Sequence, residues 1–226
     1  MGMNNLMIKK LIQKDWYLSR HAVYGCLVLG YGGLTGYLLG GFYGAYLGAI
    51  ALDIAVVMLM FFQVNAIVVF ERKDQTLAFL MSLPVSNLEF TIGKTLIGLG
   101  SYFFTWLLLY ISAIAVLTIR VDLGNTIIPY FTLLYGGVLM FYCMSFAIAF
   151  VTESEALANA SLAAGNVVIQ VSIGLGMTFS GFQESIKSPT ILWNTPVLTT
   201  LFIEIVVIVL SIAAMFYFQL RKRDFL

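Results

Sequence analysis

A stretch of 49 residues, 22–70, contains a single charged side chain, Asp53. As one helix it would be about 73 Å long at about 1.5 Å per residue, whereas the hydrocarbon core of a bilayer is about 30 Å thick. The chain must therefore turn back within this stretch. Gly40 and Gly41 are the best place, because glycine adopts turn conformations that other residues avoid. Residues 22–70 thus predict two membrane-spanning helices joined by a very short connection.

Further apolar stretches follow, each longer than the roughly 20 residues that a transmembrane helix needs. Charged residues make up 10% of the 226 residues, against about 25% in soluble domains. This leaves too little polar surface to cover a soluble globule, which excludes a soluble enzyme, a disordered chain and a nucleic-acid binder. The predicted fold is an all-α integral membrane protein, a single domain over 1–226. Its six predicted spans are about 22–40, 43–70, 95–119, 127–151, 156–181 and 197–220.

The distribution of basic residues predicts the orientation of the six spans. One side receives both termini and the loops 71–94 and 152–155, and with them all but two of the 12 Lys and Arg residues. The other side holds only Arg120 and Lys187. Because cytoplasmic loops are enriched in Lys and Arg, both termini are predicted to lie in the cytoplasm, with the chain in the plasma membrane.

Residues 1–20 alternate apolar and charged side chains at roughly helical spacing, as in Leu11, Lys14 and Leu18. This pattern predicts an amphipathic helix that lies along the cytoplasmic membrane interface. The alternative is a solvated basic flank that only sets the orientation of the first span. The segment is not expected to be a cleaved signal peptide, because no convincing cleavage site follows it.

The loop 71–94 has an internal pattern of its own. It begins with four charged residues, after which Leu77, Leu80 and Met81 share one helical face. Pro84 ends this short helix, and Ser86 with Glu89 forms a capping box that begins the third span. A short helix with an exposed apolar face must be covered by lipid or by another protein.

The run ERKDQTLAFLMSLPVSNLEFTIGK over 71–94 resembles the signature between the second and third spans of ABC-2 type transporter permeases. The run KKLIQKDWY over 9–17 is similar to the cytoplasmic lead-in of the short, six-span branch of that family. The resemblance implies that 1–20 is an interfacial elbow helix and that 71–84 contains a coupling helix for a separate ATP-binding subunit. It assigns ATPase docking to Glu71, Arg72, Lys73, Asp74, Leu77, Leu80, Leu83 and Pro84, with a smaller contact at Glu153 and Glu155.

The resemblance also implies the partners and the mechanism. Two copies of a P-loop ATP-binding subunit would bind ATP and Mg²⁺ and drive export through this chain and a second permease copy or paralogue, with membrane lipid around them. This chain would bind no cofactor and would not be an enzyme by itself. The family often carries short re-entrant helices before the last span, which here would begin inside the fifth predicted span. The expected substrate is amphipathic or apolar, such as a peptide, an antimicrobial or a lipid-like molecule.

Lys94 could be mistaken for the lysine of a phosphate-binding loop. The run Gly93-Lys94-Thr95 fits the end of that motif, but Leu88 stands where its first glycine belongs. Lys94 is instead predicted to extend its ammonium group to the membrane interface.

A few polar residues within the spans are candidates for a substrate path: Asp53, Asn65, Asn166 and Gln170. A charged residue at the centre of a membrane helix is costly and rarely lacks a purpose. Asp53 either lines a path or relays protons, or it makes a structural hydrogen bond to a neighbouring polar side chain. For Glu204, nearer the outer surface, a structural role is favoured.

Two other functions stay open: a proton-coupled secondary transporter using Asp53, and a non-transporting membrane anchor for a cytoplasmic partner.

Glycines recur every four residues at Gly32, Gly36, Gly40, Gly44 and Gly48. Small residues at this spacing allow helix backbones to approach closely. We predict that they pack two helices of one subunit together, in preference to forming a subunit interface.

Overall fold

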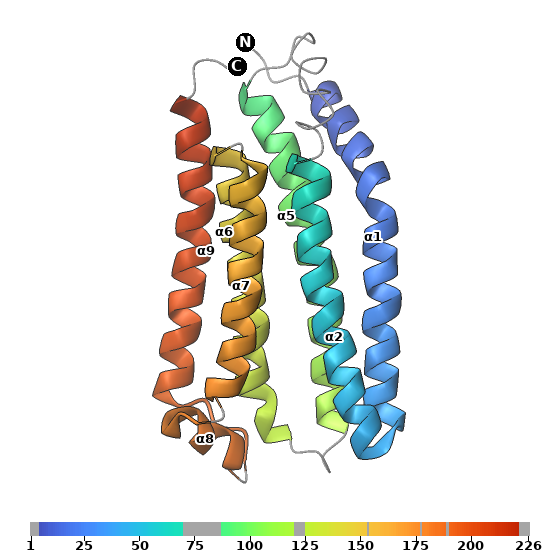
Figure 1. Ribbon diagram of the computed structural model, residues 1–226, viewed down its shortest axis with the longest axis vertical. Helices are drawn as coiled ribbons and strands as arrows, with labels where there is room; N and C mark the ends of the chain where they lie inside the picture. Colours follow the sequence, from blue (N-terminus) through green and yellow to red (C-terminus); the bar gives the residue numbers. More distant parts are fainter. Residues whose placement is uncertain are drawn as a thin grey trace.

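The computed structural model describes residues 5–69, 87–119, 125–152, 154–176, 178–188 and 190–221, and the regular structure in them is helical. Figure 1 shows the long helices side by side along one axis. In chain order the elements are α1 (Asn5–Leu39), α2 (Gly41–Val64), the π-helix η1 (Asn65–Val69), α5 (Asn87–Ile119), the 3₁₀ turn η3 (Asn125–Ile127), α6 (Ile128–Thr152), α7 (Glu155–Gly176), α8 (Ser180–Lys187) and α9 (Thr195–Arg221).

Five helices in the described residues are long and apolar enough to cross a membrane: Lys9–Leu39, Tyr43–Val69, Glu89–Ile119, Ile128–Thr152 and Thr195–Arg221. The prediction of an all-α chain with several membrane-spanning helices is confirmed. The fifth predicted span, 156–181, corresponds to the 22-residue α7 and the start of α8. Helix α7, which carries Asn159, Asn166 and Gln170, is not among the five, and the count of six spans stays a prediction.

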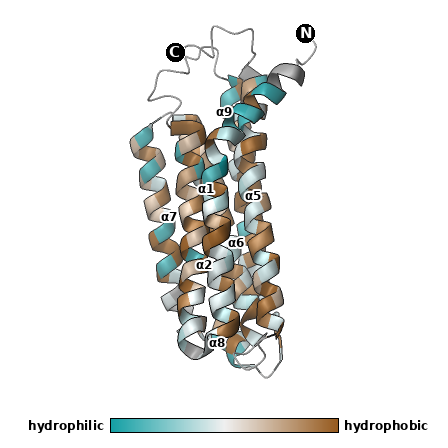
Figure 2. Ribbon diagram, turned by 90° about the vertical axis from the view of Figure 1, so that its right-hand side faces the viewer, coloured by the Kyte–Doolittle hydropathy of each residue, from teal (hydrophilic) through white to brown (hydrophobic). Residues whose placement is uncertain are grey.

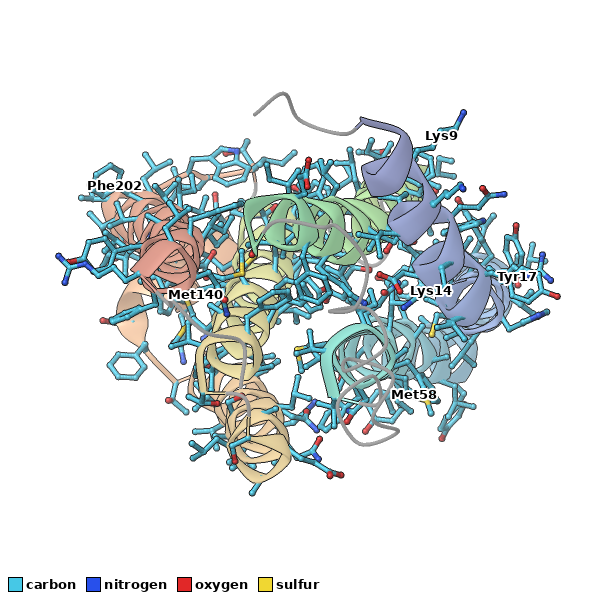
Figure 3. The ribbon with its side chains drawn as sticks, turned by 90° about the horizontal axis from the view of Figure 1, so that it is seen from above. Lys9, Lys14, Tyr17, Met58, Met140 and Phe202 are labelled. Carbon is cyan, nitrogen blue, oxygen red and sulfur yellow. The ribbon has the colours of Figure 1, made fainter. Side chains whose placement is uncertain are left out.

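The outer surface of the bundle is apolar. Val28 on α1 is 75% exposed and Phe202 on α9 is 68% exposed, and Figure 3 shows Phe202 and Met58 at the periphery. A soluble monomer rarely exposes large apolar side chains over such a wide area. Lipid is the environment that suits this surface.

Helix α1 is continuous over 35 residues. Two elements were predicted here, an interfacial helix over 1–20 and a span from 22, whereas the structure has one, because residues 5–24 contain neither proline nor glycine to break it. At about 1.5 Å per residue α1 is about 52 Å long, well beyond the roughly 30 Å of a hydrocarbon core. Figure 2 shows the hydrophilic residues of α1 gathered at its N-terminal end.

The turn predicted at Gly40 and Gly41 is confirmed. Helix α1 ends at Leu39, α2 begins at Gly41, and Gly41 has a φ of 59°, which favours glycine. Above the turn, α1 and α2 pack closely on each other. A Cβ on Gly33 of α1 would lie 2.7 Å from the carbonyl oxygen of Gly48 of α2. The close approach within one subunit is therefore present, but Gly33 and not Gly32 is in the contact, since a Cβ on Gly32 would meet nothing within 4 Å.

The long helices form two groups of three. Helix α1 packs extensively on α2 and α5, while α6 packs extensively on α7 and α9. Aromatic side chains between α5 and α6 join the groups: the rings of Tyr102 and Tyr142 stack with centroids 3.7 Å apart. Trp106 Nε1 donates a hydrogen bond of 2.9 Å to the carbonyl oxygen of Tyr135, and the Tyr142 hydroxyl donates one of 2.8 Å to that of Gly98.

The two ends of the bundle differ. The first turn of α1, the end of η1, the start of α5 and the last turn of α9 lie at one end, together with the α6–α7 connection at 152–155 (Figure 1). Helix α8 lies at the other end, where Thr126 Oγ1 donates a hydrogen bond of 3.0 Å to the carbonyl oxygen of Ile186. This short helix begins at Ser180, inside the predicted fifth span, and a re-entrant role for it stays a prediction.

Candidate functional site

The segment with the strongest sequence signature is not part of the described structure. Most residues assigned to ATPase docking lie outside the described ranges: Glu71, Arg72, Lys73, Asp74, Leu77, Leu80, Leu83, Pro84 and Glu153. Glu155 is described, and its exposed side chain lies in the first turn of α7. An acidic side chain is favourable there, because the unpaired N–H groups of a helix start carry partial positive charge.

Two residues proposed for a substrate path are brought together near the middle of the bundle. Gln170 on α7 donates a hydrogen bond of 2.9 Å from Nε2 to Oδ2 of Asp53 on α2. The pair is 117 residues apart in sequence and links the two groups of helices. Gln170 is exposed and Asp53 is partly buried, so the carboxylate can be reached from outside the bundle.

Two further polar side chains are relevant to this pair, one beside Asp53 and one beside Gln170. Tyr135 on α6 is 5% exposed and interacts electrostatically with Asp53. Asn166 precedes Gln170 by one helical turn, which places the two residues on the same side of α7. Within the described residues, the Tyr135 hydroxyl and Asn166 Oδ1 are buried without a hydrogen-bond partner. Buried polar atoms of this kind are uncommon and call for a physical explanation. The site offers acceptors for hydrogen bonds around one carboxylate.

Asn65 and Glu204 are placed elsewhere. Asn65 Nδ2 donates a hydrogen bond of 2.9 Å to the carbonyl oxygen of Phe61 in its own helix, near the end of α2. Glu204 is buried on α9 against Gly136 of α6, where a Cβ would collide with the carboxylate. Gly136 thus provides the space in which the Glu204 side chain packs.

An ion pair that sequence reasoning missed lies at the α1 end of the bundle. Lys94 Nζ is 2.8 Å from Asp15 Oδ2, and both side chains are 1% exposed. The same ammonium group donates a hydrogen bond of 3.1 Å to the carbonyl oxygen of Ile67 in η1. The prediction that Lys94 extends to the membrane interface is therefore wrong, since Lys94 points into the protein and joins α1, η1 and α5.

The sequence carries no local pattern that pairs these two residues. Asp15 interrupts the basic face of residues 9–20, and Lys94 stands two turns inside the helix that begins at Asn87. Each residue by itself fits a helix near a membrane surface. Only the packing of α1 against α5, between residues 79 positions apart, brings the two charges together.

Among the described residues, no group of three or more His, Cys, Asp or Glu side chains could hold a metal ion. The site at Asp53 is thus a carboxylate with neutral polar neighbours. No protein-family model, curated protein or solved structure matches the chain.

Proposed function

We propose that this chain is the transmembrane permease subunit of an ATP-binding-cassette exporter, with its termini in the cytoplasm. It would work with a second permease copy or a paralogue and with two copies of a separate ATPase subunit. The substrate would be amphipathic or apolar and would cross the plasma membrane. The proposal starts from the resemblance of residues 71–94 to the coupling region of ABC-2 type permeases.

The structural observation that supports it most is the common end of the bundle. η1 ends and α5 begins at the end of the bundle where α1 begins, and α6 ends and α7 begins at that same end (Figure 1). In sequence, 70–86 connects the first pair of elements and 153–154 connects the second. An ATPase that binds these two connections would therefore meet one face of the membrane protein. It would also meet the basic end of α1, where Lys9 points away from the bundle (Figure 3).

A second observation concerns how a movement at 70–86 would enter the bundle. Lys94 contacts Asp15 on α1 and the Ile67 carbonyl oxygen only two residues before η1 ends. A displacement of the start of α5 would therefore move the contacts of Lys94 with α1 and η1 at the same time. Coupling of this kind requires a contiguous packed network, and these contacts provide one.

We expect a P-loop ATPase to co-purify with the C-terminally tagged chain in mild detergent from its native host. The double substitution Leu77→Asp and Leu80→Asp should abolish this, because two carboxylates would stand on the apolar face that docks. Mass spectrometry of the eluate identifies the partner, and the amount of ATPase per permease measures the loss.

The matched control is Ile191→Asp with Leu192→Asp. Their exposed fractions are 41% and 40%, and the carbonyl oxygen of Leu192 accepts a hydrogen bond of 2.7 Å from Ser185 of α8. Helix α8 lies at the opposite end of the bundle (Figure 1). This variant should retain the ATPase. If the well-folded parent reproducibly elutes alone, or if both double variants lose the partner equally, the proposed function is wrong.

A further inference from the structure

We propose that Asp53, Tyr135 and Asn166 form a binding site for the primary ammonium group of an amphipathic amine. The site lies where α2, α6 and α7 meet, and Gln170 holds one oxygen of the Asp53 carboxylate. If the chain is the exporter proposed above, this amine is its substrate class. Only the word substrate rests on that proposed function, because the binding site itself does not depend on it.

The first step of the argument concerns charge. Asp53 lies 12 residues into α2, about 18 Å from the helix start, and therefore far from either end of the bundle. An ionised carboxylate at such a depth costs about 2.5–3.5 kcal/mol on insertion scales. Within the described residues its one hydrogen bond comes from the neutral amide of Gln170, and no ion pair compensates it.

Asp15 provides the comparison. That buried carboxylate is balanced inside the chain by Lys94 at 2.8 Å. Among the described residues no lysine or arginine pairs with Asp53, although Asp53 lies deeper in the predicted membrane than Asp15. A positively charged ligand would provide Asp53 with the counter-charge that Lys94 provides to Asp15.

The second step concerns hydrogen bonds. A primary ammonium group has three N–H donors, as in the lysine side chain. Two acceptors lie at Asp53, namely its own carboxylate and the buried phenol oxygen of Tyr135. Asn166, one helical turn before Gln170 on α7, adds a buried Oδ1 on the same side of that helix. Neither of the last two has another partner in the described structure. Each of these oxygens can accept an N–H group, and the negative charge of Asp53 favours a cation over a carboxylate or phosphate ligand.

The third step concerns access and the remainder of the ligand. Gln170 is exposed, and apolar side chains flank the pair on both helices: Val167, one turn before Gln170, is 61% exposed, and Ile50, one turn before Asp53, is 39% exposed. An alkyl chain can lie against these residues while its head group binds at Asp53. These apolar neighbours favour an amphipathic amine over a small hydrophilic cation as the ligand.

The test uses the purified full-length chain in nanodiscs of zwitterionic phospholipid, with radiolabelled dodecylamine as the probe and dodecanol as the neutral competitor. We expect saturable binding that unlabelled amine displaces and dodecanol does not. Asp53→Asn should weaken binding at least roughly tenfold, because it removes the counter-charge while keeping the shape. Tyr135→Phe should weaken it about threefold to tenfold, the effect of one hydrogen bond.

Glu204→Gln is the matched control, because it removes a buried acidic residue from a different helix, α9. It should bind the amine as the parent does. Equal binding by Asp53→Asn and the parent, equal competition by dodecanol, or an equal loss in Glu204→Gln would each overturn the site. Gel filtration and circular dichroism establish that the compared variants are folded.

If Asp53→Asn does not fold, infrared difference spectroscopy on the parent with ¹³C-labelled aspartate decides the question. Carboxylate bands that change on addition of dodecylamine and are insensitive to dodecanol are expected, and the Tyr135→Phe variant should reduce the change. A protonated carboxyl band that the amine leaves unaltered would mean that a proton satisfies Asp53, and the site would be rejected.

The binding assay contains no ATPase, so it fails independently of the proposed function. Amine binding by a chain that never co-purifies with an ATPase would support the site and reject the permease subunit. Co-purification of an ATPase without amine binding would support the permease and reject the site.

Discussion

Replacing Lys94 by methionine should lower the free energy of unfolding by about 3 kcal/mol, at the lower end of the roughly 3–5 kcal/mol found when one partner of a buried ion pair is removed. The loss arises because the Asp15 carboxylate, 1% exposed, stays buried without its closest counter-charge. Lys14 Nζ, 3.4 Å from Asp15 Oδ1, compensates part of that charge and keeps the loss from being larger. Equilibrium unfolding in mixed micelles measures the difference.

Two variants sharpen this prediction. Lys10→Met removes the same charge from an exposed position of α1 and should change stability by no more than about 0.5 kcal/mol. Asp15→Leu combined with Lys94→Met should recover most of the loss, because a buried pair can often be replaced by apolar residues. If Lys94→Met is as stable as Lys10→Met, the ion pair does not hold α1 against α5.

The second large effect is expected at the seam between α1 and α2. Gly48→Ala should destabilise the chain by about 1–3 kcal/mol, the usual effect of inserting volume into a packed interface. The new Cβ would collide with the carbonyl oxygen of Gly33 and would lie 2.6 Å from the backbone nitrogen of Tyr37. Backbone atoms cannot rotate away as a side chain can, so the two helices must separate.

Gly32→Ala is the control for this substitution. It makes the same chemical change in a helix, but its Cβ would meet nothing within 4 Å. Alanine favours helix by about 0.8–1.0 kcal/mol over glycine, so Gly32→Ala should be neutral or stabilising. Thermal unfolding of both variants in one detergent compares them directly, and equal behaviour would show that the seam is not tightly packed.

Much of the helical architecture could be predicted because each membrane span corresponds to one continuous apolar run in the sequence. The need for a turn within 22–70 followed from length, and the conformational freedom of glycine placed it at Gly40 and Gly41. The helices α6 and α9 begin and end within about two residues of the predicted spans 127–151 and 197–220. The continuity of α1 was missed because charge patterning was taken as a sign of a separate element. Charged and apolar residues can occupy one uninterrupted helix that extends beyond the hydrocarbon.

The contacts between polar residues were less predictable. Asp53 and Gln170 were both selected from the sequence, as polar residues in apolar runs, but their pairing depends on how α2 meets α7. The pair of Asp15 and Lys94 was not found, since a long-range ion pair leaves no local pattern. The docking residues of 71–84 were selected by resemblance and stay a prediction.

The aromatic contacts between α5 and α6 have a consequence for how this bundle can change shape. Two hydrogen bonds, from Trp106 to the Tyr135 carbonyl oxygen and from Tyr142 to the Gly98 carbonyl oxygen, fix the two helices at different heights. Axial sliding of α6 along α5 would break both at once. Rocking of the two groups of helices about the α5–α6 seam would preserve both bonds, so these bonds restrain sliding more than rocking.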